Sequence, residues 1–135
     1  MKFSLGTSVL VASVVAATAS ASDLKVTVNS GPTECTDAEK VKAGQFLSMH
    51  YSGYIDDSSQ SGEKGMKFDS SLDRDQTFDF QIGIGQVIPG WEEGIVGLCK
   101  GAKATLVVPP DMGYGEMGAG DVIPGGATLR CVARI

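Results

Sequence analysis

The stretch Gln86-Val87-Ile88-Pro89-Gly90-Trp91-Glu92-Glu93-Gly94 holds the only tryptophan of the chain, behind two branched apolar residues, a proline and a glycine. Proline is favoured in the first turn of a helix because its missing N–H would be unpaired there, and the two glutamates suit the positive end of a helix dipole. Trp91, Ile95 and Leu98 recur at helical spacing, whereas the glycines keep the helix short. The stretch predicts a short helix with an indole ring at its start.

On both sides of this helix, apolar residues alternate with polar ones, which is the period of a half-buried strand. The alternation predicts strands over residues 24–28, 46–53, 78–82, 102–108 and 127–135. Several strands and one helix predict an α+β fold, in which an antiparallel sheet closes over the helix. The connection from Tyr54 to Lys67 is rich in Asp, Ser and Gly, so we expect a mobile loop that buries little.

The N-terminus has the features of a secretory signal peptide. Residues 1–21 contain Lys2, then an apolar run, then the small residues Ala19-Ser20-Ala21. The run is short and diluted by Ser and Thr for a membrane span, although an uncleaved anchor is the alternative. We expect cleavage after Ala21, which leaves one domain over residues 22–135. The chain ends without a retention signal of the Lys-Asp-Glu-Leu type, so the expected location is the endoplasmic reticulum lumen or the exterior.

The charge and the cysteines narrow the expected partners and cofactors. A net charge of −5 disfavours nucleic acid and anionic membranes as partners. Cys35, Cys99 and Cys131 predict one disulfide and one free thiol in an oxidising compartment, and the sequence allows three pairings. Cys131 falls on the apolar side of the predicted last strand, whereas the other two have polar, turn-like neighbours that suit a surface bridge. The spacings of zinc and EF-hand sites are absent, so we expect no metal and no other cofactor.

Five motifs stand in order along the chain, and together they resemble the FK506-binding proteins, a family of peptidyl-prolyl cis/trans isomerases. The resemblance covers roughly residues 26–135, and its motifs are Met49-His50-Tyr51-Ser52-Gly53, Lys67-Phe68-Asp69-Ser70-Ser71, the tryptophan stretch, Gly113-Tyr114-Gly115 and Ile123-Pro124-Gly125-Gly126-Ala127-Thr128-Leu129. It implies a half-barrel sheet of five to six strands around one short helix. It also implies acceleration of X–Pro isomerisation in proteins that fold in the secretory pathway. The leader and two of the cysteines look most like the endoplasmic-reticulum form, in which Cys35 and Cys99 are bonded.

The resemblance also assigns roles to residues. An apolar pocket with Trp91 as its floor would hold the proline, and rotation of the X–Pro bond needs no nucleophile because no bond breaks. The Ile88 backbone N–H and the Tyr114 hydroxyl would bind carbonyl oxygens, and Asp69 would share a polar network with Tyr51 and Arg74. The expected catalytic residues are Tyr51, Asp69, Trp91 and Tyr114. The other expected ligand-binding residues are Phe68, Arg74, Phe78, Val87, Ile88, Val122, Ile123 and Cys131. Of these, Val122 and Ile123 would lie on a loop that overhangs the pocket.

Two features depart from the family pattern. Cys131 stands where the family usually has a pocket-facing phenylalanine, and the connection from Tyr54 to Phe68 is longer than in short cytosolic forms. The cysteine favours a non-catalytic module that binds proline or macrolides, whereas the retained expected catalytic residues favour the enzyme. A domain without any pocket function is a third interpretation. The expected partners are proline-containing polypeptides and macrolides of the FK506 or rapamycin type, and the protein is expected to be a monomer.

Overall fold

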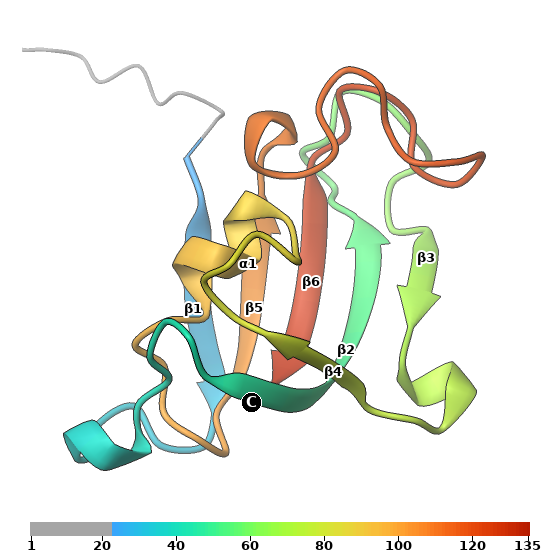
Figure 1. Cartoon of the computed structure of the whole chain (residues 1–135). Coiled ribbons are helices and arrows are strands. Elements are labelled where there is room, and N and C mark those ends of the chain that lie inside the picture. The colour runs from blue at the N-terminus through green and yellow to red at the C-terminus, as the bar shows by residue number, and fades with distance from the viewer. Residues whose placement is uncertain (1–22) are drawn as a thin grey trace, which may run out of the picture.

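The computed structural model describes residues 23–135 as an antiparallel sheet with one short α-helix. The predicted signal peptide, residues 1–21, lies outside the described residues. The strands are β1 Lys25–Ser30, β2 Phe46–Ile55, β3 Lys67–Ser70, β4 Phe78–Gln81, β5 Lys103–Val108 and β6 Leu129–Arg134. Helix α1 spans Pro89–Gly94, and the 3-10 turns are η1 Asp37–Glu39, η2 Leu72–Arg74 and η3 Pro110–Met112. The predicted α+β class is confirmed, and Figure 1 shows the sheet curving around α1.

Strand β2 organises the sheet because it pairs with three other strands. The order across the sheet is β1-β5-β6-β2-β3, and β4 pairs with β2 outside this path. The first part of β2, Phe46–Met49, pairs with β4, whereas residues from His50 onward pair with β6. The long strand therefore leads from one edge of the half-barrel into its middle, and it carries side chains from the core to the site described below.

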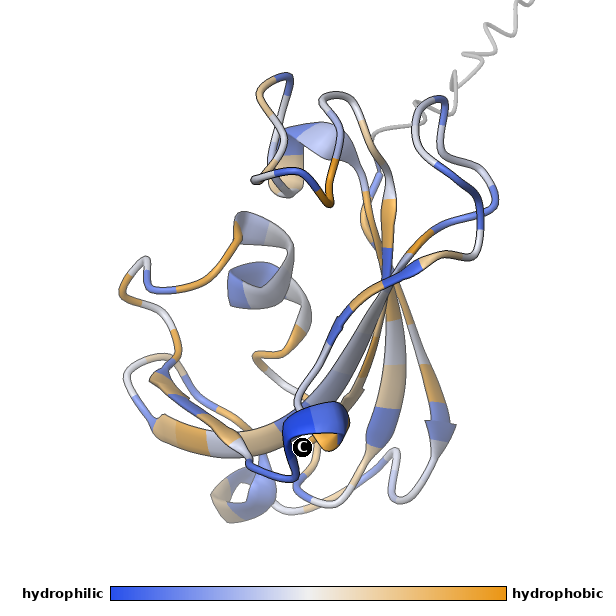
Figure 2. Ribbon diagram, turned by 90° about the vertical axis from the view of Figure 1, so that its right-hand side faces the viewer, coloured by the Kyte–Doolittle hydropathy of each residue, from blue (hydrophilic) through white to orange (hydrophobic). Residues whose placement is uncertain are grey.

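The core lies between the sheet and α1. Inward residues of the strands, among them Met49, Leu106 and Leu129, are at most 2% exposed. In Figure 2 the helix lies on one side of the long strands, and their other face is left uncovered by it. At Gly90 of α1, a Cβ atom would stand 2.6 Å from Val108 Cγ1, so the helix can pack this close to β5 only with glycine there. Helix α1 ends at Gly94, and the apolar spacing continues beyond it through the buried Ile95.

The segment after β2 differs from its prediction. Strand β3 was not expected, because it has only four residues and its alternation is masked by polar side chains. Most of the loop is exposed, as predicted, but Ser59 is an exception at 3% exposed. Its hydroxyl accepts a hydrogen bond from the Thr128 N–H at 2.9 Å, and the Ser61 hydroxyl donates to the Gly125 carbonyl at 2.8 Å. Polar side chains can be buried when they satisfy backbone groups of a neighbouring loop.

A disulfide joins Cys35 to Cys99, as the resemblance implied, and Cys131 is free and buried. The bridge is not a surface feature at both ends, because Cys99 is only 2% exposed. The polar neighbours of Cys99 in the sequence suggested an exposed position. In the structure the backbone of Lys40 pairs with that of Cys99 as in a β-bridge, and this segment lies over the cysteine. The bond ties the segment before β2 to the turn between α1 and β5. Within residues 23–135, no helix has the length and apolar character needed to cross a membrane.

Candidate active site

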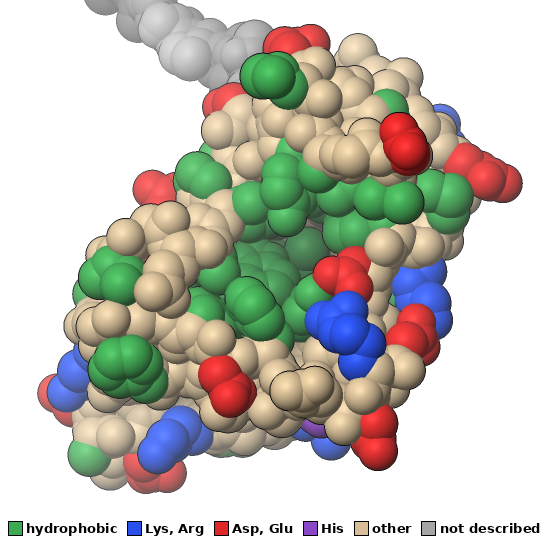
Figure 3. Space-filling model, turned by 45° about the vertical axis from the view of Figure 1, so that its right-hand side comes forward, with side chains coloured by type: hydrophobic (Ala, Val, Ile, Leu, Met, Phe, Trp, Pro, Cys, Tyr) green, Lys and Arg blue, Asp and Glu red, His purple; other side chains and the backbone are tan. Residues whose placement is uncertain are grey.

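A pocket of about 310 Å³ opens between α1 and the concave side of the sheet. Figure 3 shows a hollow floored mainly by hydrophobic side chains, with an acidic and a basic side chain together at its rim. Residues from β2, β3, β4, α1 and β6 and from two loops contribute to it. Its lining consists of Tyr51, Gly53, Phe68, Asp69, Phe78, Gly85, Gln86, Val87, Ile88, Trp91, Tyr114, Leu129 and Cys131.

Aromatic rings make the floor and one wall of the pocket. Trp91 is 6% exposed and lies edge-on to Tyr51, with ring centroids 5.1 Å apart, and to Phe78, with centroids 6.1 Å apart. Phe78 in turn stacks on Phe80 at 5.1 Å. Edge-to-face and offset arrangements of this kind are the favoured geometries of aromatic pairs. The indole is therefore fixed by its neighbours and presents a rigid apolar surface to the pocket.

A charged network stands at the pocket wall. The Tyr51 hydroxyl donates to one carboxylate oxygen of Asp69, and Arg74 Nη1 lies 2.5 Å from the other. Arg74 also donates from Nη2 to the Tyr51 hydroxyl at 3.2 Å. Burial alone raises the pKa of Asp69, but the hydrogen bonds from Tyr51 and Arg74 outweigh it and hold that pKa below its usual value. Burial and the Asp69 carboxylate raise the pKa of Tyr51. At neutral pH the network holds a carboxylate and a protonated phenol.

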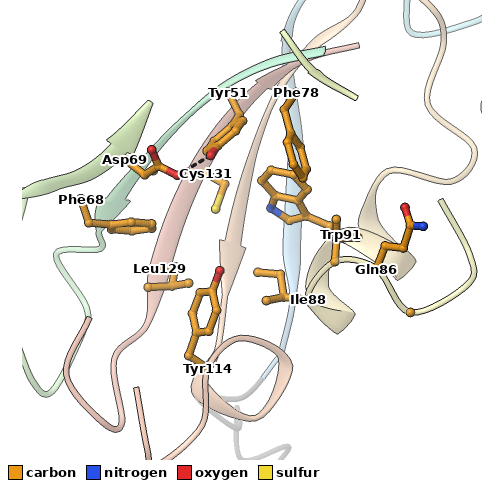
Figure 4. Close-up of a pocket in the computed structure, with 13 residues that line it drawn as sticks. Tyr51, Phe68, Asp69, Phe78, Gln86, Ile88, Trp91, Tyr114, Leu129 and Cys131 are labelled. Carbon is orange, nitrogen blue, oxygen red and sulfur yellow. Dashed lines mark hydrogen bonds between the residues drawn. The ribbon is translucent and has the colours of Figure 1, made fainter. Parts of the chain in front are cut away.

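The Ile88 backbone N–H and the Tyr114 hydroxyl are hydrogen-bond donors of the pocket that have no partner among the described residues. Ile88 precedes α1 as its N-cap, and its backbone N–H forms no hydrogen bond with the described residues. The Tyr114 hydroxyl, which points into the pocket in Figure 4, has no partner there either. Burial raises the pKa of Tyr114, with smaller contributions from Cys131 and Asp69, so the hydroxyl keeps its proton. Both groups can donate to a carbonyl oxygen of a bound molecule.

Cys131 forms the part of the floor beside the indole. Its thiol is buried, and burial raises the pKa of that thiol to about 11, so it is uncharged at neutral pH. In Figure 4 the indole nitrogen of Trp91 points toward this sulfur. The Nε1 atom is buried and has no hydrogen-bond partner among residues 23–135. A thiol is a small side chain, and the floor is correspondingly less filled than it would be with an aromatic ring.

The structure brings most of the predicted site residues together. Nine line the pocket: Tyr51, Phe68, Asp69, Phe78, Val87, Ile88, Trp91, Tyr114 and Cys131. Arg74 stands behind the wall and contacts Asp69 and Tyr51.

Val122 and Ile123, which the resemblance put on a loop that overhangs the pocket, are not among the residues that line it. Ile123 pairs with Ala119 through two backbone hydrogen bonds of 2.8 and 3.1 Å, and its side chain is 4% exposed in the core. Val122 is 48% exposed. The tight turn between Ala119 and Ile123 thus directs one side chain inward and leaves the other in solvent.

Four lining residues were missed: Gly53, Gly85, Gln86 and Leu129. Leu129 alternates with Cys131 along β6, so the strand period contained the signal. At Gly53 a Cβ atom would stand 2.5 Å from Phe68 Cζ, and the missing side chain lets the Phe68 ring lie across β2. No pattern in the sequence indicates that close approach, because it depends on the pairing of β2 with β3.

Comparison with known proteins places this arrangement in a family. A family model described as FKBP-type peptidyl-prolyl cis-trans isomerase matches residues 37–130. The chain is 56% identical over 97 residues to FK506-binding protein 2B of Rhizopus delemar and 47% identical over 106 residues to FK506-binding protein 2 of Dictyostelium discoideum. It is 50% identical over 90 residues to human peptidyl-prolyl cis-trans isomerase FKBP2.

These matches cover most of this chain but less of the relatives. They span 72%, 78% and 67% of this chain, and 43%, 73% and 58% of the Rhizopus, Dictyostelium and human proteins. The chain thus covers less than two thirds of the Rhizopus and human relatives. The crystal structure of AtFKBP13 matches with a TM-score of 0.64 and 30% identity, covering 82% of this chain and 87% of that one.

Proposed function

This chain belongs to the family of FKBP-type peptidyl-prolyl cis-trans isomerases, and on that premise we propose that it accelerates the isomerisation of X–Pro bonds in polypeptides that fold in the secretory pathway. The observation that carries the proposal is an apolar aromatic pocket in which two unpartnered donors, the Ile88 N–H and the Tyr114 hydroxyl, accompany the indole of Trp91. The Cys35–Cys99 disulfide supports an oxidising compartment.

The chemistry of the reaction fits such a pocket. The planar X–Pro amide owes part of its dipole to resonance, and the barrier to rotation is about 18–20 kcal/mol. The twisted amide loses that resonance, so water-poor aromatic surroundings favour it over the planar form. In the proposal, the proline ring rests on Trp91 and a substrate carbonyl accepts a hydrogen bond from the Ile88 N–H. Each tenfold of acceleration requires about 1.4 kcal/mol of preferential stabilisation.

The network at the wall has a positioning role in this proposal. Asp69 remains a carboxylate because Tyr51 and Arg74 donate to it, so it is a poor proton donor at neutral pH. Its negative charge polarises the Tyr51 hydroxyl and holds that ring against Trp91. The expected partners are proline-containing polypeptides, together with macrolides of the FK506 or rapamycin type. The expectations of a monomer and of a reaction without a cofactor stay predictions.

If catalysis rests on apolar surroundings and a held carbonyl, no single polar residue is indispensable. We expect Asp69→Ala and Tyr114→Phe each to lower kcat/KM about ten- to a hundredfold, equivalent to about 1.4–3 kcal/mol. A protease-coupled assay on X–Pro peptides with different X residues measures this. The matched controls, Asp57→Ala and Tyr54→Phe, change residues that do not line the pocket and should keep wild-type turnover. Complete loss of turnover in folded Asp69→Ala would instead indicate general-acid catalysis.

Cys131 favours a second candidate function, a non-catalytic module that binds proline or macrolides. The smaller side chain leaves the pocket floor without one aromatic face, and the loss of that contact lowers the affinity for a proline ring. Wild-type protein that binds X–Pro peptides yet does not accelerate their isomerisation in the assay above would support the module over the enzyme.

The pocket floor also predicts a difference in macrolide affinity. Aromatic contacts contribute about 0.5–1.5 kcal/mol beyond area burial, and buried apolar area adds roughly 25 cal/mol per Å². We expect Cys131→Phe to tighten macrolide binding by about 1–2 kcal/mol, roughly five- to thirtyfold. Isothermal titration of both proteins with one macrolide measures this, with Cys131→Ala as the control that adds no aromatic face. Equal affinities of the wild type and Cys131→Phe would mean that residue 131 does not shape the bound state.

A further inference from the structure

Side chains of β2, β5 and β6 line a second groove on the outer face of the sheet. Figure 2 shows that α1 lies on the other side of these strands. The groove has a volume of about 370 Å³ and contains no Asp or Glu in its lining. The lining residues are His50, Tyr51, Ser52, Tyr54, Leu72, Lys103, Val132 and Arg134. The chain as a whole has a net charge of −5, so the charge of this groove is opposite to that of the molecule.

The register of the strands sets the basic residues of the groove side by side. Lys103 of β5 is directly opposite Arg134 of β6, and Arg134 is directly opposite His50 of β2. Opposed side chains on one face of a sheet have Cβ atoms about 4.5–5.5 Å apart, and like charges in such positions are destabilising. Neither Lys103 nor Arg134 forms an ion pair or a side-chain hydrogen bond with any residue of the described chain.

Two other basic residues, Arg130 and Lys67, do pair with acidic side chains. Arg130, also on β6, lies 3.9 Å from an Asp56 carboxylate oxygen and over the Tyr54 ring at 5.0 Å. Lys67 is 2.9 Å from Asp73. With 16 acidic residues in the chain, the unpaired state of the groove cations does not reflect a shortage of acids. Opposed basic side chains without an acidic partner destabilise the sheet locally, and an uncompensated cost of this kind is expected at a functional site.

His50 is held in place at the edge of this row. Its Nδ1 lies 2.9 Å from the Ser71 hydroxyl oxygen, which accepts the Tyr51 N–H at 2.8 Å and donates to the Tyr51 carbonyl at 3.2 Å. Since the single hydroxyl proton is used in that last bond, we assign a proton to Nδ1, which then donates to the hydroxyl. Ser71 is fully buried, so the imidazole is anchored from below and Nε2 is its remaining polar atom.

We propose that this groove binds an acidic segment of a polypeptide, whose carboxylates pair with Arg134 and Lys103. The guanidinium group can bind a carboxylate through two parallel hydrogen bonds, and the ammonium group adds a point charge beside it. Tyr54 and Leu72, the latter 60% exposed, provide apolar contact for the stretches between carboxylates. A long polyanion such as a nucleic acid is repelled by the acidic remainder of the surface, which favours a short segment with a few carboxylates.

The groove and the aromatic pocket open on opposite faces of the sheet and share one lining residue, Tyr51. An acidic segment in the groove would therefore leave the pocket open to a proline. The two sites can engage separate segments of one client chain, which raises the effective concentration of the second segment once the first is bound. Binding of an acidic segment in the groove does not require isomerase activity, so it can be measured independently of turnover.

A proline-free probe separates the groove from the pocket. We expect fluorescein-labelled hexaglutamate to bind the wild type, measured by fluorescence anisotropy, and hexaglutamine to bind much more weakly. Binding should weaken between about 0.1 M and about 1 M salt, as the screening length falls from about 10 Å to about 3 Å. The double variant Lys103→Glu with Arg134→Glu should lose about tenfold or more in affinity. Lys103→Gln with Arg134→Gln tests the same contacts if the reversed charges prevent folding.

The matched control is Lys42→Glu with Lys64→Glu, which changes the net charge equally at two exposed residues outside the groove. It should keep the wild-type affinity, and both double variants should keep wild-type turnover of a short X–Pro peptide. No binding of hexaglutamate to the wild type, or equal weakening in the control, would overturn the proposal. Tighter binding of a single-stranded oligonucleotide than of hexaglutamate would also overturn it, by assigning the groove to nucleic acid.

Discussion

Trp91→Ala is expected to lower the free energy of unfolding by about 3–5 kcal/mol, the usual range for a buried tryptophan cut back to alanine. The indole is 6% exposed and contacts the rings of Tyr51, Phe78 and Phe80. Its removal opens a cavity in the core and takes away the floor of the pocket at once. Since domains of this kind are stable by only about 5–15 kcal/mol, the loss is a large fraction of the total. Urea unfolding followed by circular dichroism measures it.

The two roles of Trp91 are separated by Trp91→Phe. A phenyl ring keeps part of the packing and an apolar face toward the pocket, so we expect a smaller stability loss and measurable turnover. Tyr54→Phe, outside the pocket, serves as the stability control for an aromatic substitution. If Trp91→Ala were as stable as the wild type, Trp91 would not be part of the core, and the described packing would be incorrect.

Removal of the disulfide has the second large effect. Cys35 and Cys99 are separated by 64 residues, and closing a loop of that length restricts the unfolded chain by about 4 kcal/mol in the chain-entropy model. The double variant Cys35→Ser with Cys99→Ser should lose about that much stability, and dithiothreitol should reduce the wild type to the same level. Cys131→Ala is the control: it removes only the free thiol and should remain sensitive to the reductant. Identical unfolding midpoints of oxidised and reduced wild type would contradict this expectation.

Most of the fold was predictable because the strands that pack on α1 alternate strictly. Residues 102–108 and 127–135 predict β5 and β6 within a few positions, since every second side chain meets the core. Strand β3 was missed because it depends on pairing with β2 rather than on its own apolar residues. The burial of Ser59 was missed for the same reason, because its partners lie in a loop far along the chain.

The site was predicted from motif order more than from any single residue. Trp91, Tyr51 and Phe78 belong to different elements, and only the assembled half-barrel brings their rings within 6.1 Å of one another. Ile123 was expected to meet a ligand from a loop that overhangs the pocket, whereas the turn from Ala119 directs its side chain into the core. The cysteine count left three pairings open, and local polarity and the family resemblance both favoured the observed Cys35–Cys99 bond. Local polarity nevertheless gave the wrong environment for Cys99, which is buried.

The position of β6 in the sheet has a consequence for how the protein is made. The last of the six strands lies between β5 and β2, and its Arg134 pairs with His50 across most of the chain. Neither neighbour has its full set of backbone partners until β6 arrives, so the half-barrel cannot close around α1 during synthesis of the earlier strands. Sheets dominated by such distant pairings fold slowly, on the scale of milliseconds to seconds. The apolar residues of the core therefore stay uncovered until β6 has been synthesised, and the chain is most prone to aggregation during that interval.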